Sequence, residues 1–272
     1  MLPRNKLLLT DCVEGMKELP DDGIPLTVTS PPYDKLREYG GHEFTFPAVA
    51  EQLWRVTAPG GVVVWVVDDE VDNNGSESGT SAEQKLAFRD LGFTLHETLY
   101  VYRGKPRHRY RHFGVVDEAF VLSKGKPSVV TPRRVPTKWE GSRKDFGDRR
   151  HDGTLVGKPS RTVNSTRQRA VVWHYGTGRH TAEEGFIRKA RHGGLMLEQL
   201  ARDLILTYSR PSDLVFDPMA GLGTTCKMAL LNHRSYLGME ITPEYVELAQ
   251  RRLDLAHRRY LEECRGRLSA VS

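Results

Sequence analysis

Short apolar runs alternate with segments of helical spacing over the first part of the chain. Runs typical of buried strands cover residues 7–11, 24–29 and 62–67, and apolar positions repeat at the spacing of a helix in residues 13–19 and 46–57. Strands that alternate with helices are typical of a doubly wound, mostly parallel sheet. The pattern therefore predicts an α/β fold.

The same alternation returns near the C-terminus. Residues 195–208 predict a helix, and residues 214–216 and 235–239 predict strands on either side of a helix over 224–231. A last helix opens at residues 242–244, Thr-Pro-Glu, with a capping residue, a proline at the first helical position and an early acid. Both ends of the chain thus predict parts of one sheet.

The middle of the chain has a different composition. From residue 124 to about 181, Pro, Gly, Arg, Lys and Ser dominate, and the stretch is too long for a simple connection. Residues 103–169 hold 18 Lys/Arg against 6 Asp/Glu, although the net charge of the whole chain is only +5. This excess predicts a basic lobe that binds a polyanion, with a solvated basic loop as the simpler alternative.

The composition also limits where the protein acts and which metals it holds. No apolar run reaches the roughly 18 to 20 residues that span a bilayer, and the first residues lack a signal peptide's pattern. The cysteines, Cys12, Cys226 and Cys264, are far apart and form no Cys-x-x-Cys pair. We expect a soluble, cytoplasmic protein with no metal site and no disulfide framework.

A glycine-containing turn at residues 217–225, Asp-Pro-Met-Ala-Gly-Leu-Gly-Thr-Thr, joins a predicted strand to a helix. Such a turn lets the backbone approach a ligand, and the helix N-terminus offers free N–H groups to an anionic group. Glu240 ends the next strand, 17 residues after Gly223, where an acid can accept hydrogen bonds from ribose hydroxyls. A dinucleotide site would have a further glycine where Cys226 stands, so the pattern favours S-adenosylmethionine over NAD, with a purely structural turn as the alternative.

Two motifs carry a resemblance to a known family. Residues 217–225 resemble the cofactor motif Asp-Pro-Phe-x-Gly-x-Gly-Thr-Thr of amino-group DNA methyltransferases, with Met219 in place of the usual aromatic residue. Residues 29–33, Thr-Ser-Pro-Pro-Tyr, match the catalytic motif of that family. The resemblance extends through residues 53–61, 117–124 and 238–253.

The order of the motifs resembles that of the family's β class, because the catalytic motif precedes the cofactor motif. The resemblance implies a Rossmann-like, S-adenosylmethionine-dependent methyltransferase fold, circularly permuted, with an inserted target-recognition region. Residues 1–124 would form the catalytic half, residues 125–190 a basic and irregular target-recognition region, and residues 191–272 the cofactor-binding half. The implied partner is double-stranded DNA, and a cognate restriction endonuclease and a homodimer are further partners consistent with the family.

The catalytic motif suits direct methyl transfer to an exocyclic amine. Such an amine is a poor nucleophile because its lone pair is delocalised into the ring. Ser30 and the Pro31 carbonyl are placed to accept its N–H bonds, Pro31 and Pro32 stiffen the loop, and Tyr33 offers a face on which a flipped base stacks. Three acids, Asp68, Asp69 and Glu70, directly follow the predicted strand 62–67, where one of them could orient the base or relay the proton, with simple solvation as the alternative.

The cofactor, S-adenosyl-L-methionine, is expected to contact residues of both sheet halves. Asp11 closes the strand before the catalytic one, where the family commonly contacts the adenine, and capping of the next helix is the alternative role. The remaining cofactor-binding residues implied by the resemblance are Asp217, Pro218, Met219, Gly221, Gly223, Thr224, Thr225 and Glu240.

Aromatic and basic residues interleave at residues 102–112, near Trp139 and at 173–175, which predicts contacts with phosphates or bases. Ser30 before Pro-Pro resembles the cytosine-N4 enzymes more than the adenine-N6 enzymes, which usually have Asp or Asn. Cytosine N4 is therefore the predicted target and adenine N6 the alternative, with RNA or a protein glutamine as more distant ones. No cysteine follows a proline, which argues against methylation of cytosine carbon 5.

Overall fold

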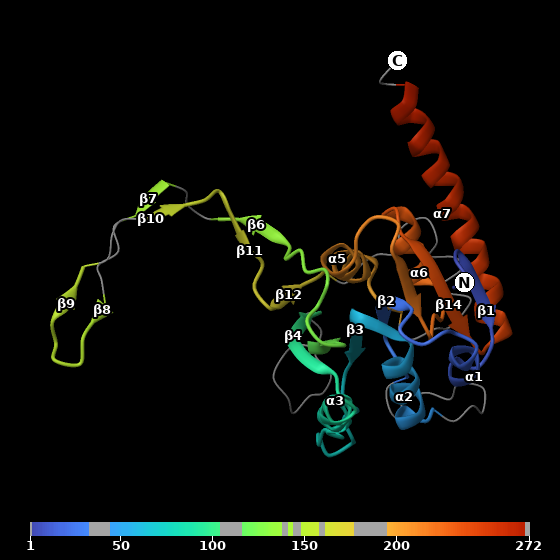
Figure 1. Ribbon diagram of the computed structural model, residues 1–272, viewed down its shortest axis with the longest axis horizontal. Helices are drawn as coiled ribbons and strands as arrows, with labels where there is room; N and C mark the ends of the chain where they lie inside the picture. The colour runs from blue at the N-terminus through green and yellow to red at the C-terminus, as the bar shows by residue number, and fades with distance from the viewer. Residues whose placement is uncertain are drawn as a thin grey trace. The chain divides into compact units, whose positions relative to one another are not determined.

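Contacts divide the chain into two compact units, one of residues 1–131 and 171–272 and the other of residues 132–170. The computed structural model describes residues 2–32, 44–103, 116–137, 141–143, 148–157, 161–176 and 195–269. The first unit, which contains both sequence motifs, is an α/β structure (Figure 1).

One eight-stranded sheet forms the frame of the first unit, with the strand order β1-β14-β13-β2-β3-β5-β4-β12. Five neighbouring strands, from β1 to β3 in this order, are parallel, whereas β5 is antiparallel to both of its neighbours and β12 is parallel to β4. The strands are β1 (Lys6–Leu9), β2 (Ile24–Thr29), β3 (Thr57–Val67), β4 (Thr94–Tyr102), β5 (Val116–Ser123), β12 (Val172–His174), β13 (Leu214–Asp217) and β14 (Ser235–Glu240).

Helices cover both faces of this sheet. Buried apolar side chains of α5 and α6 pack in one cluster, to which α7 contributes Leu253, and those of α1, α2 and α3 pack in a second cluster. None of the described helices combines the length and the apolar character that crossing a bilayer requires. The helices are α1 (Cys12–Lys17), α2 (Phe46–Val56), α3 (Thr80–Asp90), α5 (Glu198–Tyr208), α6 (Thr224–Leu231) and α7 (Pro243–Ser269).

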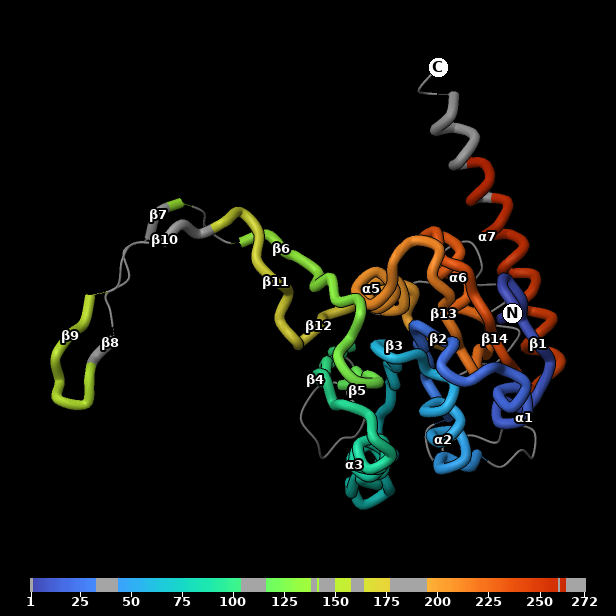
Figure 2. The backbone as a smooth tube through the Cα atoms, in the orientation of Figure 1, coloured from blue at the N-terminus to red at the C-terminus, as the bar shows by residue number. Residues whose placement is uncertain are grey.

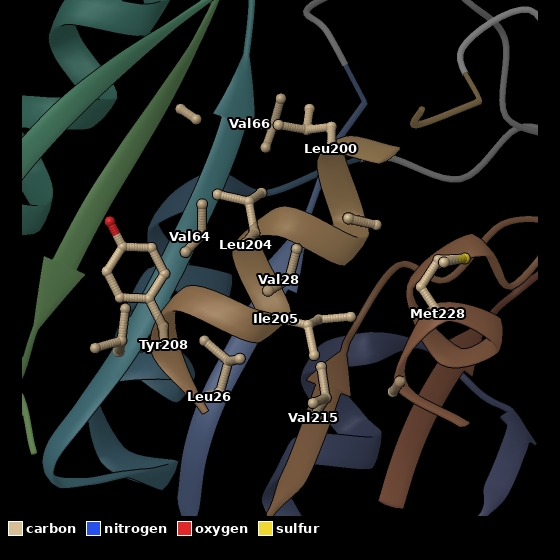
Figure 3. Packing of buried hydrophobic residues seen from close by; sticks show 14 of the residues in the cluster. Leu26, Val28, Val64, Val66, Leu200, Leu204, Ile205, Tyr208, Val215 and Met228 are labelled. Carbon is tan, nitrogen blue, oxygen red and sulfur yellow. The ribbon is translucent and has the colours of Figure 1, made fainter. Parts of the chain in front are cut away.

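Successive residues of β3 alternate between the two clusters. Val64 and Val66 pack in the first cluster with Leu200 of α5, and Figure 3 shows these side chains close together. Trp65 packs in the second cluster, where its ring lies edge-on to that of Phe88 of α3. A strand covered on both faces needs apolar residues at every position, which is why the run 62–67 shows no polar alternation.

The sheet joins the two ends of the chain. β1 pairs with β14, and Figure 2 shows the blue and red parts of the backbone side by side there. β13 then pairs with both β14 and β2, so the strand before the glycine turn lies beside the strand before the Ser-Pro-Pro loop. The predicted fold, a mostly parallel, Rossmann-like sheet in circularly permuted order, is confirmed.

Strand β3 begins earlier than predicted. The sequence predicted a helix up to residue 57 and a strand from residue 62, but β3 starts at Thr57 and passes through residues 59–61, Pro-Gly-Gly. The register with β2 shifts between Ile24 and Leu26, and Gly60 adopts a φ of 74° while its N–H donates to the Lys124 carbonyl at 2.7 Å. Glycine permits this irregular backbone, so the strand begins several residues before the predicted apolar run.

The described part of the second unit, which lies within the region 125–190 that was predicted to be irregular, contains three short antiparallel ribbons. They pair β6 (Arg134–Pro136) with β11 (Thr166–Gln168), β7 (Gly141–Arg143) with β10 (Arg161–Val163), and β8 (Asp148–Arg149) with β9 (Leu155–Val156). Ribbons without a buried face require no apolar alternation, so the hydrophobic pattern gave no signal for them.

Strand β12 also lies within the predicted target-recognition region but belongs to the main sheet. Trp173 is only 4% exposed and packs in the first apolar cluster, together with Tyr175. The Tyr175 hydroxyl donates to Asp203 Oδ2 at 2.9 Å. These two aromatic residues were candidates for contacts with DNA, but their burial assigns them to the core.

Candidate active site

The two sequence motifs meet at the carboxyl ends of neighbouring parallel strands. Phe216 of β13 lies opposite Thr27 of β2 in the register, so Asp217 and Thr29 follow at the same edge of the sheet. The Thr29 hydroxyl donates to Asp217 Oδ1 at 2.8 Å, although 188 positions separate the two residues. This buried hydrogen bond joins the residue before Ser30 to the first residue of the glycine turn.

Asp217 is a buried acid with several donors around it. The pKa of its carboxyl is raised to about 6, mainly by burial and to a lesser degree by the charge of Glu240, while hydrogen bonds from Thr29, Thr225 and the Met219 N–H oppose the rise. The Met219 N–H donates to the same Oδ1 atom at 3.2 Å. Asp217 therefore holds the start of the turn while it is largely ionised above neutral pH.

The glycine turn is fixed by Glu240 from the end of β14. Glu240 Oε2 accepts from the Gly221 N–H at 2.8 Å, and Oε1 accepts from the Thr242 N–H at 2.9 Å. Gly223 has a φ of 73°, and a Cβ there would lie 3.2 Å from the Cβ of Ala249 in α7. The turn therefore needs glycine at this position both for its backbone conformation and for the close approach of α7.

A buried network of charged side chains supports the turn, and its residues were not among those predicted from the sequence. Arg252 of α7 is 1% exposed and donates to the Leu222 carbonyl, and its Nη1 lies 3.4 Å from Thr224 Oγ1. Its Nη2 lies 3.2 Å from Glu198 Oε1, which also accepts from Lys227 Nζ at 2.9 Å. The network ties α5, α6 and α7 to the backbone of the glycine turn.

The helical spacing of α7 gave a signal for this network. Ala249, Leu253 and Ala256 are buried and lie on one face of α7, and Arg252 occupies a position on the same face. An arginine in an apolar stripe is seldom buried without partners. The sequence could therefore have marked Arg252 as buried and paired, although it could not have named the Leu222 carbonyl.

Asp11 lies at the carboxyl end of β1, next to β14. Its Oδ1 accepts from the Val13 N–H at 2.8 Å and from the Glu14 N–H at 3.0 Å, which are the bonds of a helix cap. The structure thus shows the capping role. Burial, followed by the charge of Asp11 and more weakly that of Glu240, raises the pKa of the Cys12 thiol to about 12.

The catalytic loop follows Thr29 directly. Ser30 and Pro32 are half-buried and Pro31 is buried, which places them at the edge of the sheet that also carries Asp217. Tyr33 lies outside the described residues, as do residues 104–112 and Trp139. Asp69, after β3, accepts from the Ser81 N–H at 2.8 Å and so fixes the start of α3.

A second group of polar residues lies where β4 and β12 end and β5 begins. Arg103 forms an ion pair with the buried Asp117, and the rings of Tyr102 and His174 lie 5.3 Å apart. Strand β5 is antiparallel to both β3 and β4, so β4 runs in the same direction as β3. The carboxyl end of β4 therefore lies at the same edge of the sheet as the two motifs. The two motifs and this polar group therefore lie at or just beyond one edge of the sheet.

The arrangement matches a known family over most of the chain. A family model described as DNA methylase matches residues 24–251. The chain belongs to this family of DNA methyltransferases. It is an S-adenosylmethionine-dependent enzyme of the N4/N6 amino-methyltransferase class.

Individual relatives share this similarity over nearly their whole length. The orphan methyltransferase M.BamHII of Bacillus amyloliquefaciens is 40% identical over 247 residues, which cover 88% of this methyltransferase and 92% of the relative. The PvuII cytosine-N4-specific DNA methyltransferase has a TM-score of 0.64 at 18% identity, covering 96% of this chain and 94% of its own. TTHA0409 of Thermus thermophilus, solved in complex with S-adenosylmethionine, has a TM-score of 0.56 at 23% identity, and the match covers 92% of this chain and 95% of TTHA0409.

The residues at the glycine turn fit S-adenosylmethionine. Asp217 and Glu240 are buried acids, which suit a ligand that carries an ammonium group, a positive sulfur and ribose hydroxyls. Each carboxylate oxygen of Glu240 accepts one hydrogen bond from the backbone. A carboxylate can accept about four hydrogen bonds in total, so acceptor sites are left for a ligand. The acid can therefore hold the turn and accept from a nucleoside at the same time.

Proposed function

We propose that this methyltransferase transfers a methyl group to the exocyclic N4 amino group of cytosine at a specific sequence in duplex DNA. Ser30 supports this choice of base, because serine before Pro-Pro resembles the cytosine-N4 enzymes more than the adenine-N6 enzymes. The hydrogen bond between Thr29 and Asp217 supports a single active site, because it joins the catalytic loop to the cofactor turn.

The cofactor site is proposed to lie along the carboxyl ends of β1, β13 and β14. Glu240 would accept from the ribose hydroxyls, Asp11 would contact the adenine beside its helix cap, and Met219 would pack against the cofactor where relatives have an aromatic residue. The remaining proposed contacts come from the turn and from the start of α6, and they are Asp217, Pro218, Gly221, Gly223, Thr224 and Thr225.

The reaction needs an activated amine close to an electrophilic methyl group. S-adenosylmethionine supplies that methyl group on a positively charged sulfur. Ser30 and the Pro31 carbonyl accept the two N–H bonds of the target amine, so its lone pair is directed at the methyl carbon. The N–C bond forms as the S–C bond breaks, and the extra proton on nitrogen then leaves to solvent or through Ser30.

The target base has to leave the helix for this geometry. An amino group inside a duplex is out of reach, so the base is flipped, and Tyr33 provides the face on which it stacks. Pro31 and Pro32 hold the loop rigid, which lowers the entropic cost of aligning the amine. Direct transfer requires no covalent link between the enzyme and the base.

Identification of the methylated nucleoside tests the proposal. Genomic duplex DNA is incubated with the purified enzyme and S-adenosylmethionine, digested to nucleosides and analysed by mass spectrometry. N4-methylcytosine is the expected product. N6-methyladenine would overturn the choice of base, and methylation of RNA or of a peptide with none on duplex DNA would overturn the DNA substrate.

A variant pair tests the role of the loop. Ser30→Ala is expected to lose methyl transfer while it binds the cofactor with unchanged affinity in calorimetry. Ser76→Ala, in an exposed loop, serves as the matched control and should transfer at the wild-type rate. Unchanged turnover in Ser30→Ala would contradict the catalytic assignment.

A further inference from the structure

The second unit combines a strong positive charge with exposed or half-buried positions at every residue whose exposure is described. Residues 132–170 contain 11 Lys/Arg and 4 Asp/Glu. Among residues 132–137, 141, 150–157 and 164–170, whose exposure is described, none is buried. Two-stranded ribbons of this kind gain little stability from apolar burial. Their positive charge suits a negatively charged partner.

An apolar pair stands out on this polar unit, at the tip hairpin formed by residues 148–156. Leu155 is 65% exposed, which exceeds the exposure of every other large apolar residue in the described chain, and the adjacent Val156 is 40% exposed. The register pairs Arg149 with Leu155, and the exposed residues Arg150 and His151 follow in the turn. Leu155 thus lies close in the chain to the exposed Arg150 and His151.

The turn of the tip hairpin is well formed. The Arg150 N–H donates to the Thr154 carbonyl at 2.8 Å, and the Gly153 N–H donates to the Arg150 carbonyl at 2.9 Å. Asp152 Oδ1 accepts from the Thr154 N–H at 2.9 Å, and hydrogen bonds from Thr154 lower the pKa of this carboxyl. The acid is therefore used within the turn, which presents Leu155 in a defined position.

We propose that the tip hairpin binds in a groove of the DNA duplex, with Leu155 as its apolar contact and Arg150 on a phosphate. This inference rests on the proposed function, because it takes the substrate to be duplex DNA. Basic residues neutralise phosphates, and apolar side chains that enter a groove contact bases or separate base steps. Both kinds of group occur within the tip hairpin, and a phosphate contact alone would leave the exposed Leu155 unexplained.

The two contacts predict different effects of salt on DNA binding. Binding of a labelled duplex of about 30 base pairs is titrated at several salt concentrations, with S-adenosylhomocysteine present throughout. Arg150→Ala is expected to reduce the slope of log K against log salt concentration by about one. Leu155→Ala is expected to weaken binding about five- to tenfold at every salt concentration without a change in slope.

A matched control separates the tip from general effects of an exposed leucine. Leu86→Ala, on α3 of the first unit, removes a side chain that is 48% exposed and should bind the duplex like the wild type. Wild-type affinity in Leu155→Ala would overturn the apolar contact. A dimer that forms without DNA and is lost in Leu155→Asp would instead assign the tip hairpin to a second copy of the chain.

The outcome for the tip hairpin is distinguishable from that for the proposed function. If the wild type shows no salt-dependent binding to duplex DNA and no transfer to it, the proposed substrate is wrong. If the wild type binds and methylates duplex DNA while both tip variants match it, only the role of the tip hairpin is wrong. Methylome sequencing of expressing cells then supplies the target sequence with which the titration is repeated.

Discussion

Replacing Thr29 by valine tests whether the hydrogen bond between the two motifs stabilises the site. Valine keeps the shape of threonine but removes the hydroxyl that donates to Asp217 at 2.8 Å. Both residues are buried, so water does not replace the lost donor. Loss of a buried hydrogen bond to a charged acceptor costs about 2 kcal/mol, which is the expected fall in the free energy of unfolding at about pH 8.

The effect of Thr29→Val should depend on pH in a defined direction. Burial raises the pKa of Asp217 to about 6 in the folded protein, so the acid is protonated below that pH and its bond to Thr29 is weaker. The destabilisation should therefore shrink to about 1 kcal/mol near pH 5. Loss of the donor also raises the pKa of Asp217 further, because that donor stabilises the ionised form.

The same strand provides a matched control. Thr27 is as buried as Thr29, but its hydroxyl has no hydrogen-bond partner among the residues that the structure describes. Thr27→Val should leave the free energy of unfolding unchanged or raise it, since it removes an unpaired buried hydroxyl. Urea unfolding of both variants at both pH values is the assay, and equal losses in the two variants, or a pH-independent loss in Thr29→Val, would refute the reasoning.

Three further predictions concern the cofactor turn. Glu240→Ala should weaken S-adenosylmethionine binding at least about tenfold in calorimetry with little change in duplex affinity, because the Gly221 and Thr242 N–H groups lose their acceptor; an unchanged Kd would count against it. Arg252→Met should lower both Tm and cofactor affinity, whereas Arg252→Lys should restore Tm more than affinity because one ammonium cannot reproduce the guanidinium bonds; equal recovery of both would point to a merely structural role. Asp217→Asn removes a carboxyl whose pKa is raised by burial, so wild-type stability should fall relative to the variant by about 2 kcal/mol as pH rises from about 4 to 6, and parallel stability profiles in chemical unfolding would contradict this.

The sequence predicted those parts of the fold that depend on local pattern. The apolar run 62–67 predicted a strand buried on both faces, and α7 begins at Pro243, where the Thr-Pro-Glu signal predicted a helix start. The circularly permuted arrangement followed from the resemblance, through the order of the two motifs. Gly60 shows the limit of this reasoning, because its N–H bonds to the carbonyl of Lys124, a contact that no local pattern contains.

Contacts between residues far apart in the chain could not be predicted from the sequence. Thr29 belonged to the predicted motif, but its partner Asp217 became visible only when β2 and β13 were seen to pair. Trp173 showed the aromatic and basic surroundings typical of a DNA contact, yet it is buried because β12 returns to the sheet. Local composition cannot distinguish an aromatic residue that binds a partner from one that fills the core.

The residues that flank the second unit on either side are held within the first. The Thr131 N–H donates to the Thr207 carbonyl of α5, and the Val171 carbonyl accepts from the Tyr100 N–H of β4. The chain therefore leaves and rejoins the first unit at two fixed points, and none of the described residues between 132 and 170 belongs to the main sheet or its two apolar clusters. An insertion of different length and sequence could be joined at these points, so one cassette can be exchanged while the sheet that carries the two motifs is inherited intact.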